Sequence, residues 1–82
     1  MGQSLPAISG NDLIDLLIAK DGWIKGRHSK HGQVLTKKLP DRTLVTVIPT
    51  KSESLRPGLL AHILGSKQTR IGREGLEKLL KD

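Results

Sequence analysis

The spacing of apolar residues changes twice along this chain of 82 residues, and these changes determine which elements it can form and in what order. Residues 10–20 repeat Leu and Ile at three- and four-residue intervals, which is the period of a helix with one buried face. Residues 23–48 contain short runs rich in β-branched residues, separated by Gly, Pro and Asp, as is typical of strands and turns. Beyond Pro57 the helical period returns. The pattern predicts the order α-β-β-β-α, followed by one more short helix.

Residues that favour helix ends mark the expected boundaries. Ser9 or Asn11 can cap the first helix, because the side-chain oxygen of either can accept a bond from a free backbone N–H group. Gly22 can take the left-handed conformation that commonly follows a helix. Pro57 suits the first turn of the second helix, where its missing N–H leaves no bond unmade. Residues 73–80 form the expected final helix.

Three strands are expected, at residues 23–28, 33–39 and 44–48, and their tight connections predict an antiparallel meander. The expected fold class is α+β, with the helices on one face of a three-stranded antiparallel sheet, because this arrangement buries the apolar side of both layers. The other face of the sheet is expected to stay open and polar. If the first strand alternates without interruption, His28 and Lys25 lie on opposite sides of it.

Composition limits the classes of protein to which the chain can belong. It has no cysteine, which excludes disulfide bonds, thiolate nucleophiles and sulfur-ligated zinc. Trp23 is the only aromatic residue, so the core must be aliphatic, and modules that stack bases on several aromatic rings are disfavoured. One domain is expected over residues 1–82, with residues 1–8 as a loose tail. The sequence shows no signal-peptide pattern and no apolar run that could cross a bilayer, so a cytoplasmic location is expected.

Positive charge is concentrated in the middle of the chain, whose formal net charge is +6. Residues 20–42 contain seven basic and two acidic residues, whereas residues 1–19 contain two acidic residues and no basic one. A basic segment of this kind is typical of a surface that meets phosphate groups. An ordinary solvated face is the alternative explanation.

Three histidines are candidates for chemistry, and His31 is the strongest. It lies in the expected turn between the first two strands, close in sequence to Arg27 and Lys30. Imidazole can take and give a proton near neutral pH, which suits attack of a ribose 2′-hydroxyl on its adjacent phosphate, and nearby cations stabilise the developing charge. Taken alone, an ordinary polar turn residue is the more common explanation. His28 is a candidate helper, and His62 is expected to be a surface residue of the second helix.

No metal site is expected. His28 and His31 are three residues apart in a strand and turn, and no carboxylate is spaced to complete a coordination set. Ser29 beside His31 does not make a nucleophilic dyad without an oriented third group. Arg56 stands immediately before Pro57, where phosphate binding at a helix start and simple helix initiation explain it equally well.

Several short motifs occur in an order that resembles the HicA family of bacterial toxin ribonucleases. The residues that carry the resemblance are Gly22-Trp23, Arg27 and His31, then Val45-Thr46-Val47-Ile48-Pro49, and then Leu55-Arg56-Pro57-Gly58-Leu59-Leu60-Ala61-His62-Ile63-Leu64. Each motif is weak alone, but their order and spacing agree over residues 10–80. Lys51 stands where many members of the family have a histidine, two residues after the strand proline.

The resemblance implies a fold like that of the double-stranded-RNA-binding domain. It also implies the activity of an mRNA interferase, which is the endoribonuclease of a type II toxin–antitoxin system. One essential histidine is implied in the turn between strands one and two, and it corresponds to His31. A HicB-like antitoxin protein that covers the active site is the implied partner. Neither a metal ion, a small-molecule cofactor nor a membrane is expected.

The leading hypothesis is therefore a toxin that cleaves single-stranded mRNA without a metal ion, with His31 as general base or acid. The residues expected to bind RNA are Lys25, Arg27, Lys30, Lys37, Lys38 and Arg56. One alternative is a non-catalytic module of the double-stranded-RNA type, which reads shape and phosphates. Another is a protein-interaction domain whose basic face meets an acidic antitoxin.

Overall fold

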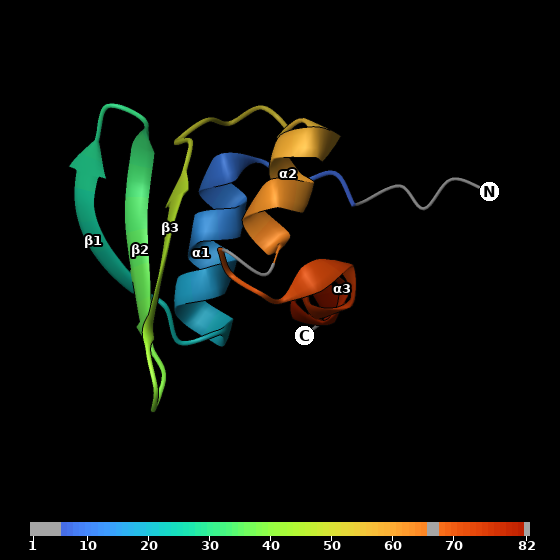
Figure 1. Ribbon diagram of the computed structural model, residues 1–82. Helices are drawn as coiled ribbons and strands as arrows, with labels where there is room; N and C mark the ends of the chain where they lie inside the picture. The colour runs from blue at the N-terminus through green and yellow to red at the C-terminus, as the bar shows by residue number, and fades with distance from the viewer. Residues whose placement is uncertain (1–5, 66–67, 82) are drawn as a thin grey trace.

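The computed structural model describes residues 6–65 and 68–81. Within these residues the elements follow the order α1 (Gly10–Lys20), β1 (Ile24–Ser29), β2 (Gly32–Lys38), β3 (Thr43–Ile48), α2 (Pro57–Leu64) and α3 (Gly72–Lys81). The strands form one antiparallel sheet in the order β1-β2-β3, and the helices lie on one side of it (Figure 1). The expected α+β class, the order of elements and the three-stranded sheet are confirmed.

Helix α1 begins and ends where its capping residues predict. Ser9 is the N-cap, and its Oγ accepts a hydrogen bond from the backbone N–H of Asp12 at 3.1 Å. At the other end, the N–H groups of Asp21 and Trp23 both donate back into the last turn of the helix. Gly22 between them has a φ of +76°, the left-handed conformation that lets the chain leave the helix.

The chain before α1 is tied to the segment before α2. The loose tail expected over residues 1–8 lies outside the described residues at positions 1–5. Ile8 is buried, and its carbonyl oxygen accepts a hydrogen bond from the N–H of Leu55 at 2.8 Å. Ser9 and Ser54 form an isolated antiparallel bridge beside this contact. These contacts hold the start of α1 close to the chain that follows β3.

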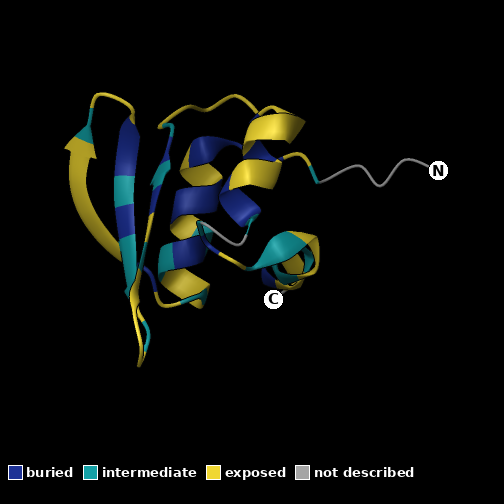
Figure 2. Cartoon of the chain, in the orientation of Figure 1, coloured by how far each residue is buried: buried dark blue, intermediate teal, exposed yellow. Residues whose placement is uncertain are grey.

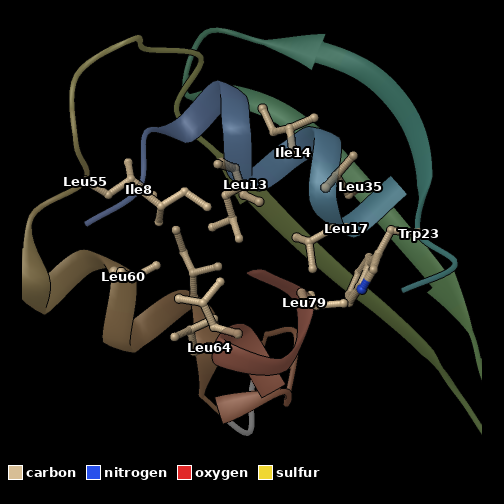
Figure 3. Close-up of a cluster of buried hydrophobic side chains, with 13 residues drawn as sticks. Ile8, Leu13, Ile14, Leu17, Trp23, Leu35, Leu55, Leu60, Leu64 and Leu79 are labelled. Atoms are coloured by element: carbon tan, nitrogen blue, oxygen red, sulfur yellow. The ribbon is translucent and has the colours of Figure 1, made fainter. Parts of the chain in front are cut away.

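An aliphatic core fills the space between the sheet and the helices (Figure 3). Leu13 of α1, Leu35 of β2 and Ile48 of β3 are completely buried in it. The buried hydrophobic residues are Ile8, Leu13, Ile14, Leu17, Trp23, Leu35, Ile48, Leu55, Leu60, Ile63, Leu64, Leu76 and Leu79. Figure 2 shows α1 with buried positions between the sheet and the other helices, whereas β1 is exposed along most of its length. Trp23 is the one aromatic member of a core that is otherwise aliphatic, as composition predicts.

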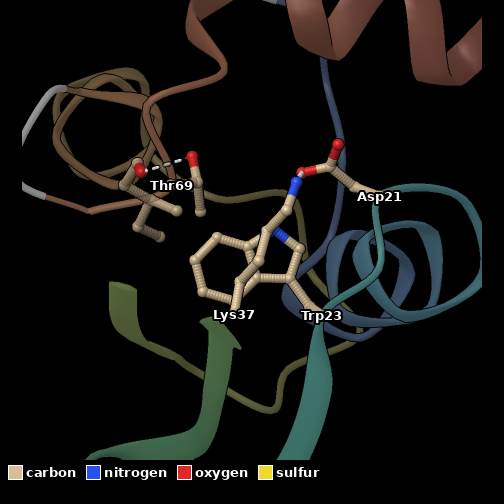
Figure 4. A network of polar contacts seen from close by, with 5 residues as sticks. Asp21, Trp23, Lys37 and Thr69 are labelled. Carbon is tan, nitrogen blue, oxygen red and sulfur yellow. Dashed lines mark hydrogen bonds and ion pairs between the residues drawn. The ribbon is translucent and has the colours of Figure 1, made fainter. Parts of the chain in front are cut away.

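Polar contacts hold the ring of Trp23 at the end of α1 (Figure 4). Its Nε1–H donates to Oδ2 of Asp21 at 2.8 Å, and the same oxygen lies 3.3 Å from Nζ of Lys37. A buried indole N–H needs an acceptor, so this carboxylate fixes the orientation of the ring. The ion pair also gives Lys37 a structural contact within the protein.

The sheet face that points away from the helices is more apolar than expected. Strand pairing places Ile24, Thr36 and Val45 in one row across this face, and Val34 and Val47 in the next row. Ile24 is 63% exposed and Val45 is 48% exposed. The prediction of a polar outer face is therefore wrong, because the β-branched residues that favour a strand occupy both of its faces.

Strand β1 does not alternate without interruption. Lys25 pairs with Leu35 and His28 pairs with Gln33, so two residues of β1 lie opposite a single residue of β2. This is a β-bulge, and Gly26 within it has no side chain to obstruct the bend. Leu35 and Gln33 share the helix-facing side of β2, so Lys25 and His28 lie on the same side of β1. Uninterrupted alternation, the condition under which they were expected on opposite sides, is therefore not met.

Candidate functional site

Three segments that are distant in the sequence meet at one end of the sheet: the β1–β2 turn, the chain that leaves β3, and the start of α1 (Figure 1). The turn consists of Lys30 and His31, with Ser29 and Gly32 paired on either side of it. His31 thus lies in the turn between the first two strands, at the position from which its role was inferred.

Two glycines allow this close approach to the end of β3. A Cβ atom at Gly32 would overlap the carbonyl oxygen of Ile48, and a Cβ atom at Gly10 would overlap the carbonyl oxygen of Pro49. Gly32 also has a φ of +140°, which residues with side chains rarely adopt. Glycine at these two positions therefore brings the β1–β2 turn and the start of α1 against the same stretch of backbone.

Backbone hydrogen bonds fix the chain after β3. The N–H of Lys51 donates to the carbonyl oxygen of Pro49 at 3.0 Å, and the carbonyl oxygen of Lys51 accepts from the N–H of Asn11 at 3.1 Å. The N–H of Asn11 is one of the donors in the first turn of α1 that have no partner within the helix. The contact therefore satisfies the helix end and anchors the main chain of Lys51, whose side chain is exposed.

The two histidines at this end of the sheet are held in different ways. Nε2 of His28 lies 3.2 Å from Oγ1 of Thr50, so a hydrogen bond positions the ring itself. For His31 the backbone N–H donates to Oγ of Ser29 at 3.2 Å, and the Ser29 hydroxyl donates to the carbonyl oxygen of Gly32 at 3.1 Å. Ser29 thus stabilises the turn that presents His31, which remains exposed to solvent.

These residues surround a shallow hollow of about 140 Å³. Its lining consists of His28, Lys30, His31, Gly32, Pro49, Thr50 and Lys51. Two histidines, whose side chains can transfer protons, and two lysines, whose charge attracts phosphate, thus line one small site. Among the described residues that line the hollow there is no carboxylate to neutralise these cations.

A second hollow, of about 190 Å³, extends this surface towards α2. Its lining includes Arg56 and Glu53, and it shares Pro49 and Lys51 with the first hollow. Lys51 therefore lies between the histidines and Arg56. Of the residues predicted to bind RNA, Lys30 and Arg56 are brought to these adjoining hollows.

Two of the predicted RNA-binding residues lie at the far end of the sheet. Lys37 and Lys38 end β2, whereas Gly32 beside the hollow begins it. The rise of a strand over this length separates the two ends by about 20 Å. Lys37 also forms the ion pair with Asp21. The structure therefore does not bring these lysines together with His31.

Strand β1 carries the other two residues that were predicted to bind RNA, Lys25 and Arg27. Both are exposed, and β1 is an edge strand that pairs only with β2 in the described sheet. The bulge lies between Lys25 and His28. Both cations are therefore exposed along this edge of the sheet.

Sequence reasoning missed Thr50 and Lys51 as residues of the site. A signal for them was present at Pro49, since proline commonly ends a strand and the chain must turn after it. In an antiparallel meander, the end of the third strand lies beside the start of the second and therefore beside the first turn. This topology predicts that residues after Pro49 lie close to His31.

A larger hollow, of about 410 Å³, lies along α1. It is lined by Ala7, Ile8, Asp12, Asp15, Leu16, Ala19 and Leu80. The two charged groups in this lining are carboxylates, which repel phosphate. The smaller basic hollow is therefore the better candidate for chemistry on RNA.

The chain matches no protein-family model, and comparisons with curated proteins and with solved structures likewise found no match. Across residues 6–65 and 68–81, no group of three or more His, Cys, Asp or Glu side chains is placed to hold a metal ion. No helix in this part of the chain has the length and apolar character needed to cross a membrane.

Proposed function

We propose that this protein is an endoribonuclease toxin that cleaves mRNA without a metal ion, with His31 as its catalytic residue. The observation that carries the proposal is the hollow whose lining includes two histidines, His28 and His31, and two lysines, Lys30 and Lys51. Imidazole transfers protons near neutral pH, and fixed cations stabilise charge on a reacting phosphate. The motifs that resemble the HicA family favour the same function.

The proposed reaction begins with attack of a ribose 2′-oxygen on the adjacent phosphorus. The O2′–P bond forms as the P–O5′ bond breaks, which leaves a 2′,3′-cyclic phosphate on one fragment and a 5′-hydroxyl on the other. A base takes the proton of the 2′-hydroxyl, and an acid gives a proton to the departing 5′-oxygen. Lys30 and Lys51 stabilise the negative charge that builds up on the phosphoryl oxygens. RNA supplies its own nucleophile, so the reaction needs no metal-bound hydroxide.

The proposal includes the surface that holds the rest of the RNA. Lys30, Lys51 and Arg56 form a short basic track across the two adjoining hollows. Lys25 and Arg27 extend it along β1. Such residues bind the backbone of RNA with little regard to sequence, and their contribution weakens as salt is added.

The fold and partner are proposed on the same motifs. Helices on one face of a three-stranded meander suit a fold of the double-stranded-RNA-binding type, in a HicA-like toxin. The proposed partner is a HicB-like antitoxin whose acidic surface covers the basic hollow. Such a toxin would act in the cytoplasm, where its mRNA substrate is found.

The test is cleavage of a labelled mRNA in EDTA by the parent protein and by the His31→Ala variant. The parent should produce fragments and His31→Ala should not, because removal of a proton-transfer group slows such a step by about 10²–10⁴-fold. His62→Ala is the matched control, since His62 is exposed on α2 and does not line the hollow. An intact parent that leaves RNA uncut would refute the nuclease, and binding of duplex RNA without cleavage would identify a non-catalytic module instead.

A further inference from the structure

We infer that His28 is the second proton-transfer residue of this site, acting together with His31, and that Thr50 is its positioning residue. The inference rests on the proposed ribonuclease function and adds to it a second catalytic group. It starts from the position of His28, which lines the same hollow as His31.

The reaction requires proton transfer at two oxygens. The attacking 2′-oxygen and the leaving 5′-oxygen lie on opposite sides of the phosphorus during in-line displacement, so one imidazole cannot serve both at once. The other titratable groups that line the hollow are the ammonium groups of Lys30 and Lys51. An ammonium group has no lone pair with which to accept a proton, and it suits phosphate binding instead. An ammonium group can still give a proton, so among the described lining residues His28 is the one group besides His31 that can serve in either role, as acid or as base.

The β-bulge places His28 on the side of the sheet where the hollow lies. Without the extra residue, alternation along β1 would turn His28 to the opposite face. The bulge is stabilised by Gln33, which is 4% exposed and whose side-chain amide donates to the carbonyl oxygens of Gly26 and Arg27. A buried amide that satisfies the carbonyl groups of the bulge keeps it in place. The orientation of His28 is therefore built into the strand.

Thr50 holds the ring of His28 in a way that permits proton transfer. Its Oγ1 lies 3.2 Å from Nε2. A hydroxyl can accept a bond from an N–H or donate one to a ring lone pair, so it can hold imidazole and imidazolium alike. With Nε2 engaged by Thr50, Nδ1 is the ring atom left to exchange a proton with RNA.

The first measurement compares kcat and KM for single-site RNA cleavage by the parent, His31→Ala, His28→Ala and His28→Gln. Glutamine can keep a hydrogen bond to Thr50 but cannot transfer a proton, so both His28 variants should lose about 10²–10⁴-fold in kcat with little change in KM. His62→Ala should match the parent. Circular dichroism confirms that each variant is folded.

The second measurement uses an RNA whose scissile 5′-oxygen is replaced by sulfur, a leaving group that needs no proton. This substrate should restore cleavage by whichever histidine variant lacks the acid, and it should leave the variant that lacks the base inactive. Rescue of one variant supports the pair and assigns both roles. Rescue of neither, or of both, would overturn it.

Thr50 is tested by replacing its hydroxyl with a methyl group. Thr50→Val should lower kcat by about fivefold, as expected for loss of one hydrogen bond, and Thr50→Ser should restore it. If the parent cleaves RNA and His31→Ala does not, but His28→Ala retains kcat to within about threefold, the inference fails while the proposed function stands. A parent protein that does not cleave RNA would overturn both.

Discussion

Replacement of Gly10 by alanine should change stability through two opposing effects, helix propensity and steric overlap. Gly10 is the first residue of α1, and alanine is favoured over glycine within a helix by about 0.8–1 kcal/mol. Helix propensity alone therefore predicts that Gly10→Ala stabilises the protein. The tertiary structure predicts the opposite, because the new Cβ would overlap the carbonyl oxygen of Pro49. That oxygen belongs to the backbone, so no change of rotamer can move it away.

The change in the free energy of unfolding depends on the groups that the new methyl group displaces. Forcing an extra methyl group into a filled site costs about 1–3 kcal/mol. Displacing the chain after β3 also weakens the hydrogen bond from Asn11 to Lys51, whose net contribution is about 1 kcal/mol. Helix propensity returns at most about 1 kcal/mol, so the free energy of unfolding should fall by about 2 kcal/mol. For a domain of this size, Tm should fall by about 8–16 °C.

Urea unfolding followed by tryptophan fluorescence measures this change, because Trp23 is the one tryptophan and is 2% exposed. Gly58→Ala is the matched control. Gly58 lies in α2, and a Cβ there would meet no atom of the described chain within 4 Å. This variant should be more stable than the parent by up to about 1 kcal/mol. A Gly10→Ala protein as stable as the parent would refute the close approach of α1 to the end of β3.

Three further changes test other parts of the argument. Asp21→Ala should lower the free energy of unfolding by about 1–3 kcal/mol in urea, because it leaves Nε1 of the buried Trp23 without its acceptor. Gln33→Leu should lower stability by a similar amount and reduce the rate of RNA cleavage, because the carbonyl groups of the bulge lose their donor; unchanged cleavage would show that the bulge holds its shape unaided. Lys51→Ala should make the plot of the logarithm of the RNA-binding constant against the logarithm of salt concentration less steep by about 0.7–0.9, because one phosphate contact is lost. Lys81→Ala, in α3, is the control. Equal slopes for the two variants would argue against a phosphate contact at Lys51.

Local signals explain why most of the fold could be predicted from the sequence. Capping by Ser9, the left-handed Gly22 and the proline at the start of α2 all act within a few residues. Element ends therefore follow directly from neighbouring residue types. The bulge in β1 could not be predicted in this way, because Gln33 of another strand stabilises it. A glycine within the strand, Gly26, was the one local indication of it.

The candidate site likewise has a part that neighbouring residues predict and a part that depends on contacts between distant segments. Lys30 and His31 could be placed because their turn follows from the two strands that flank it. Thr50 reaches His28 only because the chain after β3 packs against the β1–β2 turn, which is a contact between segments about twenty residues apart. The pattern of apolar residues predicts the meander, which brings the chain after Pro49 towards this turn, but it does not predict which side chains meet there. The contact between Thr50 and His28 is therefore visible only in the tertiary structure.

The site has two kinds of residue, and they link stability to activity in different ways. Gly10 and Gly32 act through the backbone at the end of β3, so a side chain at either position disturbs both the packing of the fold and the hollow. His31 projects from a turn and is exposed, so its loss should change stability by no more than about 0.5 kcal/mol. Replacing His31 should therefore abolish activity without loss of stability, whereas replacing Gly10 or Gly32 should reduce both. If Gly10→Ala lost stability but kept the kcat of the parent, the hollow would form without that close approach. The bulge in β1 would then be sufficient to bring His28 to its place.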